Sequence, residues 1–334
     1  MMIRDRLTRF LGYFQPFDWH HMVVCVPGMA ACLLYGLITR DTVSGAIGAG
    51  AAFSVGFGLR RIRPFRSMLG AAALMTAATL IGSLTGSFFL AFVLIAGAAA
   101  AGCACLALID EDWWWVALQA TIALLVASHY AGSAKIGFVR ASIVLGAGLV
   151  QMVLVWGLNR LIPQGHLKPV ANAPIPATAR AMTIYGLVSA VSVAAALLIA
   201  YGLRLDKAYW APMTALIVLK PKFHLTRQRG WERLLGNLAG CAAAIAVTFV
   251  LPPVQWFDSV LAVAGSGAAY ALLKARYATF SLAVGFTAMM LLYTAHVSAL
   301  YGSEQRLYAT AIGGLVSIGV MWLASRTIAK DYRI

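Results

Sequence analysis

The chain has 334 residues, of which 61% are hydrophobic and only 11% are charged. A soluble domain is nearer half apolar and a quarter charged, and a soluble fold of this size could not hide so much apolar surface. The composition excludes a soluble enzyme, a secreted disulfide scaffold and a disordered chain, and it predicts a membrane protein. The net charge of +15 lies mostly in short clusters between apolar runs, as in membrane-protein loops, so nucleic acid is not an expected partner.

Apolar windows separated by charged residues, proline or glycine predict an all-α polytopic membrane protein with twelve transmembrane helices. A spanning helix needs roughly 20 mainly apolar residues. The predicted spans are 22–38, 43–59, 67–87, 88–109, 113–130, 138–159, 180–201, 208–219, 233–251, 256–273, 278–296 and 305–326. The 208–219 span is short and contains Pro212, which is typical of a broken or tilted helix.

An internal repeat predicts two halves. Residues 140–160 and 306–326 share two arginines, one glycine and one tryptophan at the same offset of 166 residues. Two six-helix blocks in the same orientation, 1–160 and 180–334, would be parallel repeats related by a pseudo-two-fold axis along the membrane normal, with a pathway where they meet. Chance similarity between apolar sequences is the alternative. The proline-rich stretch 161–179 is expected to be a cytoplasmic linker.

The positive charges predict the orientation of the chain. With the N-terminus in the cytoplasm, 20 of the 26 Lys and Arg residues fall in cytoplasmic segments and 6 fall outside. This asymmetry is the one that the positive-inside rule describes. We therefore expect a multi-pass protein of a bacterial-type inner (plasma) membrane, surrounded by the lipid bilayer, with both termini in the cytoplasm.

The segment 206–241 carries the most informative pattern. A Tyr-Trp pair opens the short span, a proline and a basic loop follow, and Arg-x-x-Gly-Asn-x-x-Gly opens the next helix. This pattern resembles the fusaric acid resistance and aromatic acid exporter family, which has threonine where this chain has Asn237. Arg306, Thr310 and Gly313 at the head of the last span are also similar to that family.

The resemblance implies an inner-membrane transporter that exports small organic or aromatic carboxylates, in a short form without the large cytoplasmic domains of longer members. A small organic anion is then the substrate, and a periplasmic adaptor or a homo-oligomer is a partner to consider. Two rival functions stay open. One is an anion channel or uniporter on the same scaffold, and the other is a non-transporting membrane scaffold subunit.

Four arginines that each open an apolar helix are candidates for substrate binding, because a guanidinium binds carboxylate in a bidentate manner and stays charged. They pair across the halves as Arg66 with Arg233 and Arg140 with Arg306. Snorkelling to lipid headgroups is the alternative for each arginine, and an aromatic belt is the alternative for the Tyr-Trp pair. The candidate substrate-binding residues are Arg66, Arg140, Arg233, Arg306, Tyr209, Trp210, Asn237 and Thr310.

His129 and His296 occupy matching positions near the external ends of the fifth and eleventh spans. They are candidates for proton coupling, with simple packing as the alternative. None of the eleven Asp and Glu residues lies near the middle of a predicted span. Proton-coupled carriers usually bury a carboxylate there. The sequence therefore predicts export driven by the membrane potential, with at most a modulatory proton step at the two histidines.

The chain shows no pattern that indicates an enzyme. Clustered Asp or His at metal-binding spacing is absent from the sequence, and so is a glycine-rich phosphate loop followed by Lys-Ser/Thr. Such groups hold a metal, deprotonate a nucleophile or bind nucleotide phosphates. We expect no catalytic residue, no metal and no cofactor.

Overall fold

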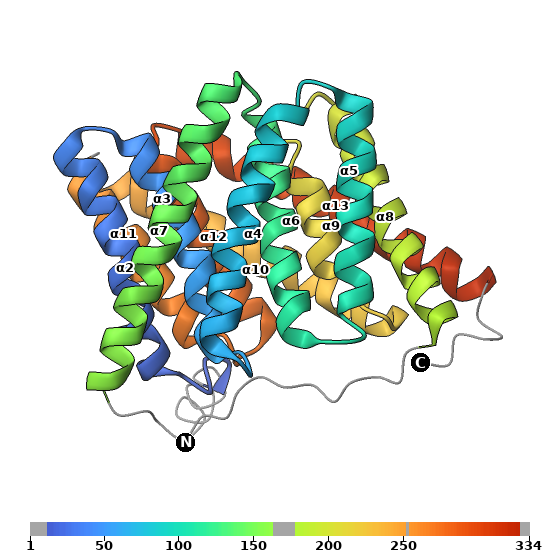
Figure 1. The fold of residues 1–334 in the computed structure, drawn as a ribbon, viewed down its shortest axis with the longest axis horizontal. Helices are drawn as coiled ribbons and strands as arrows, with labels where there is room; N and C mark the ends of the chain where they lie inside the picture. The colour runs from blue at the N-terminus through green and yellow to red at the C-terminus, as the bar shows by residue number, and fades with distance from the viewer. Residues whose placement is uncertain (1–11, 163–177, 252–253, 328–334) are drawn as a thin grey trace. The chain divides into compact units, whose positions relative to one another are not determined.

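The computed structural model describes residues 12–162, 178–251 and 254–327, and regular structure in these ranges is helical, without a strand. Each α-helix overlaps one predicted span, and Figure 1 shows the helices. The helix Phe223–Val250 begins ten residues before the span predicted at 233–251, because part of the basic segment is helical, so Arg233 lies within this helix and does not open it. The helices are α2 (Trp19–Thr39), α3 (Thr42–Gly56), α4 (Pro64–Thr85), α5 (Phe89–Leu106), α6 (Glu111–His129), α7 (Ala134–Leu161), α8 (Ala179–Gly202), α9 (Trp210–Val218), α10 (Phe223–Val250), α11 (Gln255–Ala271), α12 (Tyr277–Thr294) and α13 (Ala299–Thr327). A 3-10 turn, Phe57–Arg60, follows α3.

Nine helices in the described ranges are long and apolar enough to cross a membrane. The helices α6, α9 and α11 fall outside this set. The helix α9 has only 9 residues and contains Pro212, α11 has 17 residues, and α6 begins with two acidic residues. The chain is thus an all-helical, multi-pass membrane protein, whereas the arrangement as two six-span repeats stays a prediction.

The chain forms two compact units, each assembled from three separate stretches. Unit 1 draws its described residues from Met1–Phe57, Val150–Lys168 and Glu232–Glu304, and unit 2 from Gly58–Leu149, Pro169–Trp231 and Gln305–Ile334. The boundaries predicted at 160 and 180 stay a prediction. Most of the predicted 161–179 linker lies outside the described residues.

Unit 1 is built around the contact of α2 with α3 and α11, and α11 also packs on α12. The ring of Tyr270 fills its centre, with the rings of His21, Phe53 and Phe57 at centroid distances of 5.0, 5.4 and 4.8 Å. The Tyr270 hydroxyl donates to the carbonyl of Phe53 at 2.9 Å. A buried tyrosine needs such an acceptor, because an unpaired hydroxyl is costly away from water.

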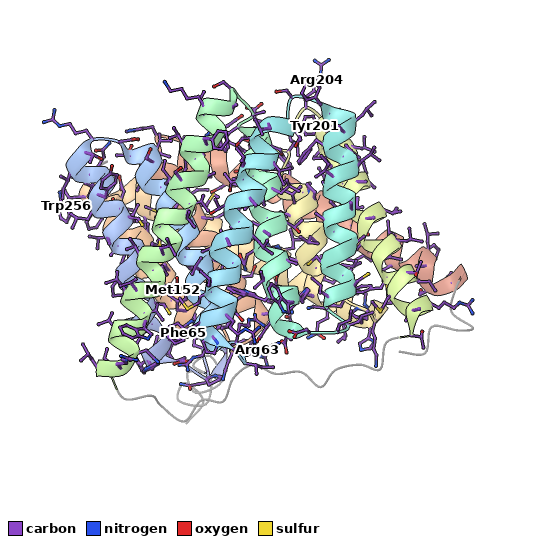
Figure 2. The ribbon with its side chains drawn as sticks, viewed as in Figure 1. Arg63, Phe65, Met152, Tyr201, Arg204 and Trp256 are labelled. Carbon is purple, nitrogen blue, oxygen red and sulfur yellow. The ribbon has the colours of Figure 1, made fainter. Side chains whose placement is uncertain are left out.

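Unit 2 is built around α6, which packs on α4, α5 and α9, while α8 covers α5 and α9. The helix α6 begins at Glu111 because the Asp110 carboxylate accepts from the backbone N–H groups of Asp112 and Trp113 at 2.9 and 3.1 Å. Such a cap satisfies amide donors that have no partner within the helix. In unit 2, Arg63 and Arg204 lie at opposite ends (Figure 2). These two ends carry the two charged sites described below.

Candidate functional site

Aromatic and cationic side chains meet in unit 2 where α6 ends and α9 begins. The Tyr209 ring lies 5.1 Å from the His129 ring and 5.4 Å from the Trp210 ring, centroid to centroid. The guanidinium carbon of Arg306, on α13, is 5.2 Å from the centroid of Trp210. Tyr209, Trp210 and Arg306 are all buried. The structure thus brings four of the predicted site residues together.

Tyr130 joins a fifth predicted residue to this group. Arg140 donates to the carbonyl oxygen of Tyr130, and its guanidinium carbon lies 5.7 Å from the Tyr130 ring. The ammonium of Lys207 donates to the Tyr130 hydroxyl at 3.3 Å and lies 5.2 Å from the same ring. The Tyr130 and Tyr209 rings are 6.4 Å apart. We call His129, Tyr130, Arg140, Lys207, Tyr209, Trp210 and Arg306 the Tyr209 cluster.

Sequence reasoning missed Tyr130 and Lys207. Only their positions in the sequence could have indicated them, since Tyr130 follows His129 and Lys207 comes two residues before Tyr209. Neither residue stands out by type, because tyrosine and lysine at helix ends are common in membrane proteins.

A close contact between α13 and α9 fixes the buried side of the cluster. A Cβ atom on Gly313 would lie 2.2 Å from the carbonyl oxygen of Ala211, so the two helix backbones touch there. The Ser317 hydroxyl, one turn further, donates to Gly313 at 2.8 Å and lies 3.2 Å from the carbonyl of Ala215. Thr310 is buried one turn after Arg306, on the same side of α13. The seating of α13 therefore sets the distance between Arg306 and Trp210.

The Tyr209 cluster has the chemistry to bind an aromatic anion. A guanidinium or ammonium above an aromatic ring is attracted by the ring electrons, by about 0.5–2 kcal/mol depending on burial. The same cations offer hydrogen-bond donors to a carboxylate. The rings of Tyr209 and Trp210 provide apolar faces that suit stacking with an aromatic ligand.

Arg66 does not belong to this cluster. It is exposed on the first turn of α4 and lines a small cavity with Arg63, Asp112 and Trp113. Asp112 and Trp113 lie at the start of α6, whereas His129 is its last residue. A helix of 19 residues is about 28 Å long. Arg66 and the Tyr209 cluster therefore lie at opposite ends of α6.

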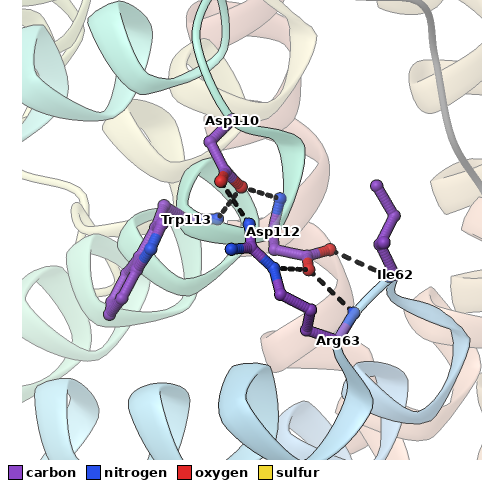
Figure 3. A network of polar contacts seen from close by, with 5 residues as sticks. All are labelled: Ile62, Arg63, Asp110, Asp112 and Trp113. Carbon is purple, nitrogen blue, oxygen red and sulfur yellow. Dashed lines mark hydrogen bonds and ion pairs between the residues drawn. The ribbon is translucent and has the colours of Figure 1, made fainter.

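The Asp112 carboxylate anchors the loop that precedes α4 (Figure 3). It accepts from the backbone N–H groups of Ile62 and Arg63 at 3.0 and 2.9 Å and from Arg63 Nε at 3.2 Å. Asp110 completes the network through an ion pair with Arg63. Burial alone would raise the pKa of Asp110, but the hydrogen bonds from Trp113 and Arg63 outweigh it, and the pKa lies below its ordinary value.

Arg233 and Asn237 lie in unit 1, where α10 faces α12. The buried Arg233 donates to the Tyr277 hydroxyl at 3.1 Å. A Cβ atom on Gly236 would lie 2.3 Å from the carbonyl oxygen of Ala278, so the backbones approach closely. Asn237 is buried in the same contact, with its Oδ1 atom 3.0 Å from the position of a Cβ on Gly285. This environment is that of a helix contact with one buried guanidinium.

His296 lies at the other end of α12 from Tyr277. Its backbone has a φ of 64°, and its Nε2 atom is 3.3 Å from the Thr42 hydroxyl and 3.4 Å from the Gln255 amide nitrogen. The 18 residues of α12 measure about 27 Å, so His296 and Arg233 do not share a site within unit 1. Among the described residues, no three His, Cys, Asp or Glu side chains are grouped in a way that suits a metal ion.

Comparisons with known proteins give one family match and two uncharacterised relatives. Residues 193–320 match the family described as fusaric acid resistance protein-like. The protein YhfK of Escherichia coli K12, described as uncharacterised, is 32% identical over 138 residues, which are 40% of this chain and 19% of that protein. The uncharacterised Synechocystis protein slr1298 is 34% identical over 156 residues, 45% of this chain and 19% of that protein. The chain thus matches about a fifth of the length of either relative. No solved structure matches it.

Proposed function

We propose that this chain, whose residues 193–320 match the fusaric acid resistance protein-like family, exports small aromatic or other organic carboxylate anions from the bacterial cytoplasm. The family match and the nine apolar helices support a role in membrane transport or resistance. That the substrate is an organic carboxylate and that transport is outward are proposed in addition. They rest on the Tyr209 cluster and on the distribution of positive charge.

The contact between Arg306 and Trp210 is the observation that carries the proposal. Both side chains are buried, the guanidinium carbon is 5.2 Å from the ring centroid, and Tyr209 lies beside them. An anion with an aromatic ring needs a cation and an apolar face at one place, because each part of the ligand must lose its water. Arg140 and Lys207 are half-buried at the side of the cluster, where they attract an anion electrostatically.

The topology of the proposal follows the positive-inside rule. The loop that precedes α4 and the basic segment 220–233 face the cytoplasm, both termini are cytoplasmic, and the Tyr209 cluster lies toward the periplasm. Export then moves an anion from the basic end of unit 2 to the Tyr209 cluster. A periplasmic adaptor or a second copy of the chain is a partner that fits this arrangement.

Charge removal at Arg306 tests the proposal. In proteoliposomes loaded with benzoate, Arg306→Gln should reduce efflux about tenfold or more, because a charge-assisted hydrogen bond to the carboxylate is lost. Arg306→Lys should keep part of the activity, and Lys135→Gln, which changes an exposed cation on α7, should keep all of it. Unchanged efflux in a folded Arg306→Gln protein would contradict the proposal.

The same proteoliposomes separate the rival functions. A channel should give single-channel currents, and its flux should not saturate with benzoate. A scaffold should show no benzoate movement with any variant, while it retains a protein partner in a pull-down. A carrier should show saturable flux without unitary currents.

A further inference from the structure

A second group of cations surrounds the start of α6, at the opposite end from the Tyr209 cluster. Arg61 pairs with Glu111 at 3.5 Å, and its guanidinium carbon lies 5.8 and 5.3 Å from the ring centroids of Trp114 and Trp115. The Lys220 ammonium lies 4.8 Å from the Trp114 ring. Arg229, on α10, acts electrostatically on Lys220. We call Arg61, Lys220 and Arg229 the Lys220 cluster.

Arg61 is placed very differently from its neighbour Arg63. The Arg63 side chain is 41% exposed and contacts both Asp110 and Asp112. The Arg61 side chain is only 9% exposed, and its Nε atom has no hydrogen-bond partner among the described residues. A buried guanidinium donor without an acceptor is costly. An acceptor from outside the chain would remove that cost.

Hydrogen bonds hold both the N–H and the carbonyl of Lys220, so the position of its Cα atom is fixed. Its N–H donates to the Thr226 hydroxyl oxygen at 2.9 Å, and that hydroxyl donates to the Lys220 carbonyl at 3.0 Å. One residue earlier, the Leu219 carbonyl accepts from the Tyr185 hydroxyl of α8 at 3.3 Å. These hydrogen bonds therefore hold the backbone of the connection between α9 and α10 in one position.

Titratable groups from four parts of unit 2 act on Lys220. Arg229 of α10 and Arg61 of the loop before α4 disfavour the protonated amine, while Glu111 of α6 and the Cys103 thiol of α5 favour it. Burial, with the repulsion of Arg229 and Arg61, lowers the pKa of Lys220 to about 7 against the partial opposition of Glu111. Near neutral pH this amine is thus without its proton for much of the time.

We propose that the Lys220 cluster is a second binding site, for a small carboxylate, and that the carboxylate binds together with a proton taken up by Lys220. The carboxylate accepts from the guanidinium groups and from the ammonium that forms, and the proton comes from the solvent at the same end. The inference takes its ligand class from the proposed export function. In that scheme the cluster is where the anion is loaded.

The proton linkage gives the site a defined pH dependence. A bound anion stabilises the ammonium, so affinity is highest below pH 7 and falls as Lys220 loses its proton above pH 7. Between pH 6 and pH 8 the affinity for a monocarboxylate should fall roughly tenfold, the change in the protonated fraction of an amine with a pKa near 7. No such dependence is expected of a site made of arginines alone, because they stay charged.

Calorimetric titration of the purified full chain with benzoate tests the proposal. Measurements at pH 7 in two cationic buffers of different ionisation enthalpy should show uptake of roughly half a proton per benzoate bound. Lys220→Arg should still bind benzoate but take up no proton. Arg61→Gln should weaken binding about tenfold or more. Lys222→Gln and Arg227→Gln change exposed cations of the same segment and should behave as the unchanged protein.

Several results would overturn the proposal. Proton uptake that persists in Lys220→Arg would assign the proton to another group. If Arg61→Gln, Lys220→Gln and the unchanged protein bind benzoate equally well, the Lys220 cluster is not a benzoate-binding site. If the protein binds inorganic phosphate tightly through the same residues and does not bind benzoate, the ligand of this site is a phosphate, such as a lipid headgroup, and not a carboxylate.

The measurement also separates this inference from the proposed function. Arg306→Gln should retain the Lys220-dependent proton uptake, because the two clusters lie at opposite ends of α6. A chain that binds benzoate in this way but does not move it across a membrane would contradict only the export proposal. Benzoate efflux without Lys220-dependent proton uptake would contradict only the inference about the second site.

Discussion

The Asp112 carboxylate, buried at the start of α6, accepts two backbone N–H groups from the loop before α4 and one bond from Arg63 Nε. Asp112→Ala would leave these donors without an acceptor in a half-buried place. We expect a loss of about 2–3 kcal/mol in the free energy of unfolding, measured by thermal melting in detergent. Asp41→Ala removes an exposed cap of α3 that accepts from Ser44, and it should cost only about 1 kcal/mol. Equal losses would contradict the role assigned to Asp112.

Asp110 makes the same network sensitive to acid. Its pKa lies below the ordinary value, so its ion pair with Arg63 stabilises the fold above about pH 4 and is lost as the pH falls through the lowered pKa. The Asp110→Asn protein lacks this ion pair at every pH. The difference in melting temperature between the two proteins should therefore shrink between pH 5 and pH 3. A difference that stays constant over this range would show that the charge of Asp110 contributes nothing.

At the scale of the helices, the contact of α13 with α9 depends on one glycine. A Cβ on Gly313 would lie 2.2 Å from Ala211 O and 2.9 Å from Thr214 Cβ, whereas a Cβ on Gly314 would meet no atom within 4 Å. Gly313→Ala should push α13 away from α9, lower the melting temperature and impair benzoate efflux, because Arg306 moves off Trp210. Gly314→Ala should leave efflux intact and add up to about 1 kcal/mol of stability from helix propensity. Similar behaviour of the two variants would contradict the close contact.

Each apolar window between charged or Pro/Gly breaks contains a helix, and the shortness of α9 was expected from Pro212. The start of α10 was predicted ten residues too late, because the basic segment before Arg233 is helical as well. The contacts between helices did not follow. In a membrane helix both the packed face and the lipid face are apolar, so periodicity does not reveal which side meets a neighbour. For this reason the sequence did not predict that Arg306 contacts Trp210 or that Arg61 contacts Trp115.

The pairing of arginines in the sequence repeat did not predict which arginines lie close together. Arg66 and Arg140 were grouped because each opens an apolar helix, yet in unit 2 one lies beside the start of α6 and the other contacts Tyr130, just beyond its end. A helix start alternates between the two membrane faces along the chain, so helix-opening residues divide between two ends. Arg61, which no pattern singled out, instead occupies the buried position beside Glu111.

At the scale of the whole molecule, the charge moved per cycle decides the energy source. Lys220 sits in a connection fixed by Thr226 and Tyr185 at one end of unit 2, so its proton exchanges with the solvent of that end. In the proposed scheme the proton is released there when the anion leaves. The transported species is then the anion alone, and moving one negative charge out of a negative interior gains about 2.3 kcal/mol per 100 mV.

We therefore expect benzoate efflux to follow the membrane potential. In vesicles whose interior is held at one pH, collapse of the potential should stop efflux against a gradient, while collapse of the pH difference from outside should leave it nearly unchanged. A lower interior pH should speed loading through Lys220 at any potential, and Lys220→Arg should remove that effect. Replacement of both His129 and His296 by glutamine should alter the rate without changing the dependence on potential. Efflux that stops when the pH difference alone is collapsed, and that fails in the same way in the double-histidine variant, would assign proton coupling to the histidines and refute the transport of an anion alone.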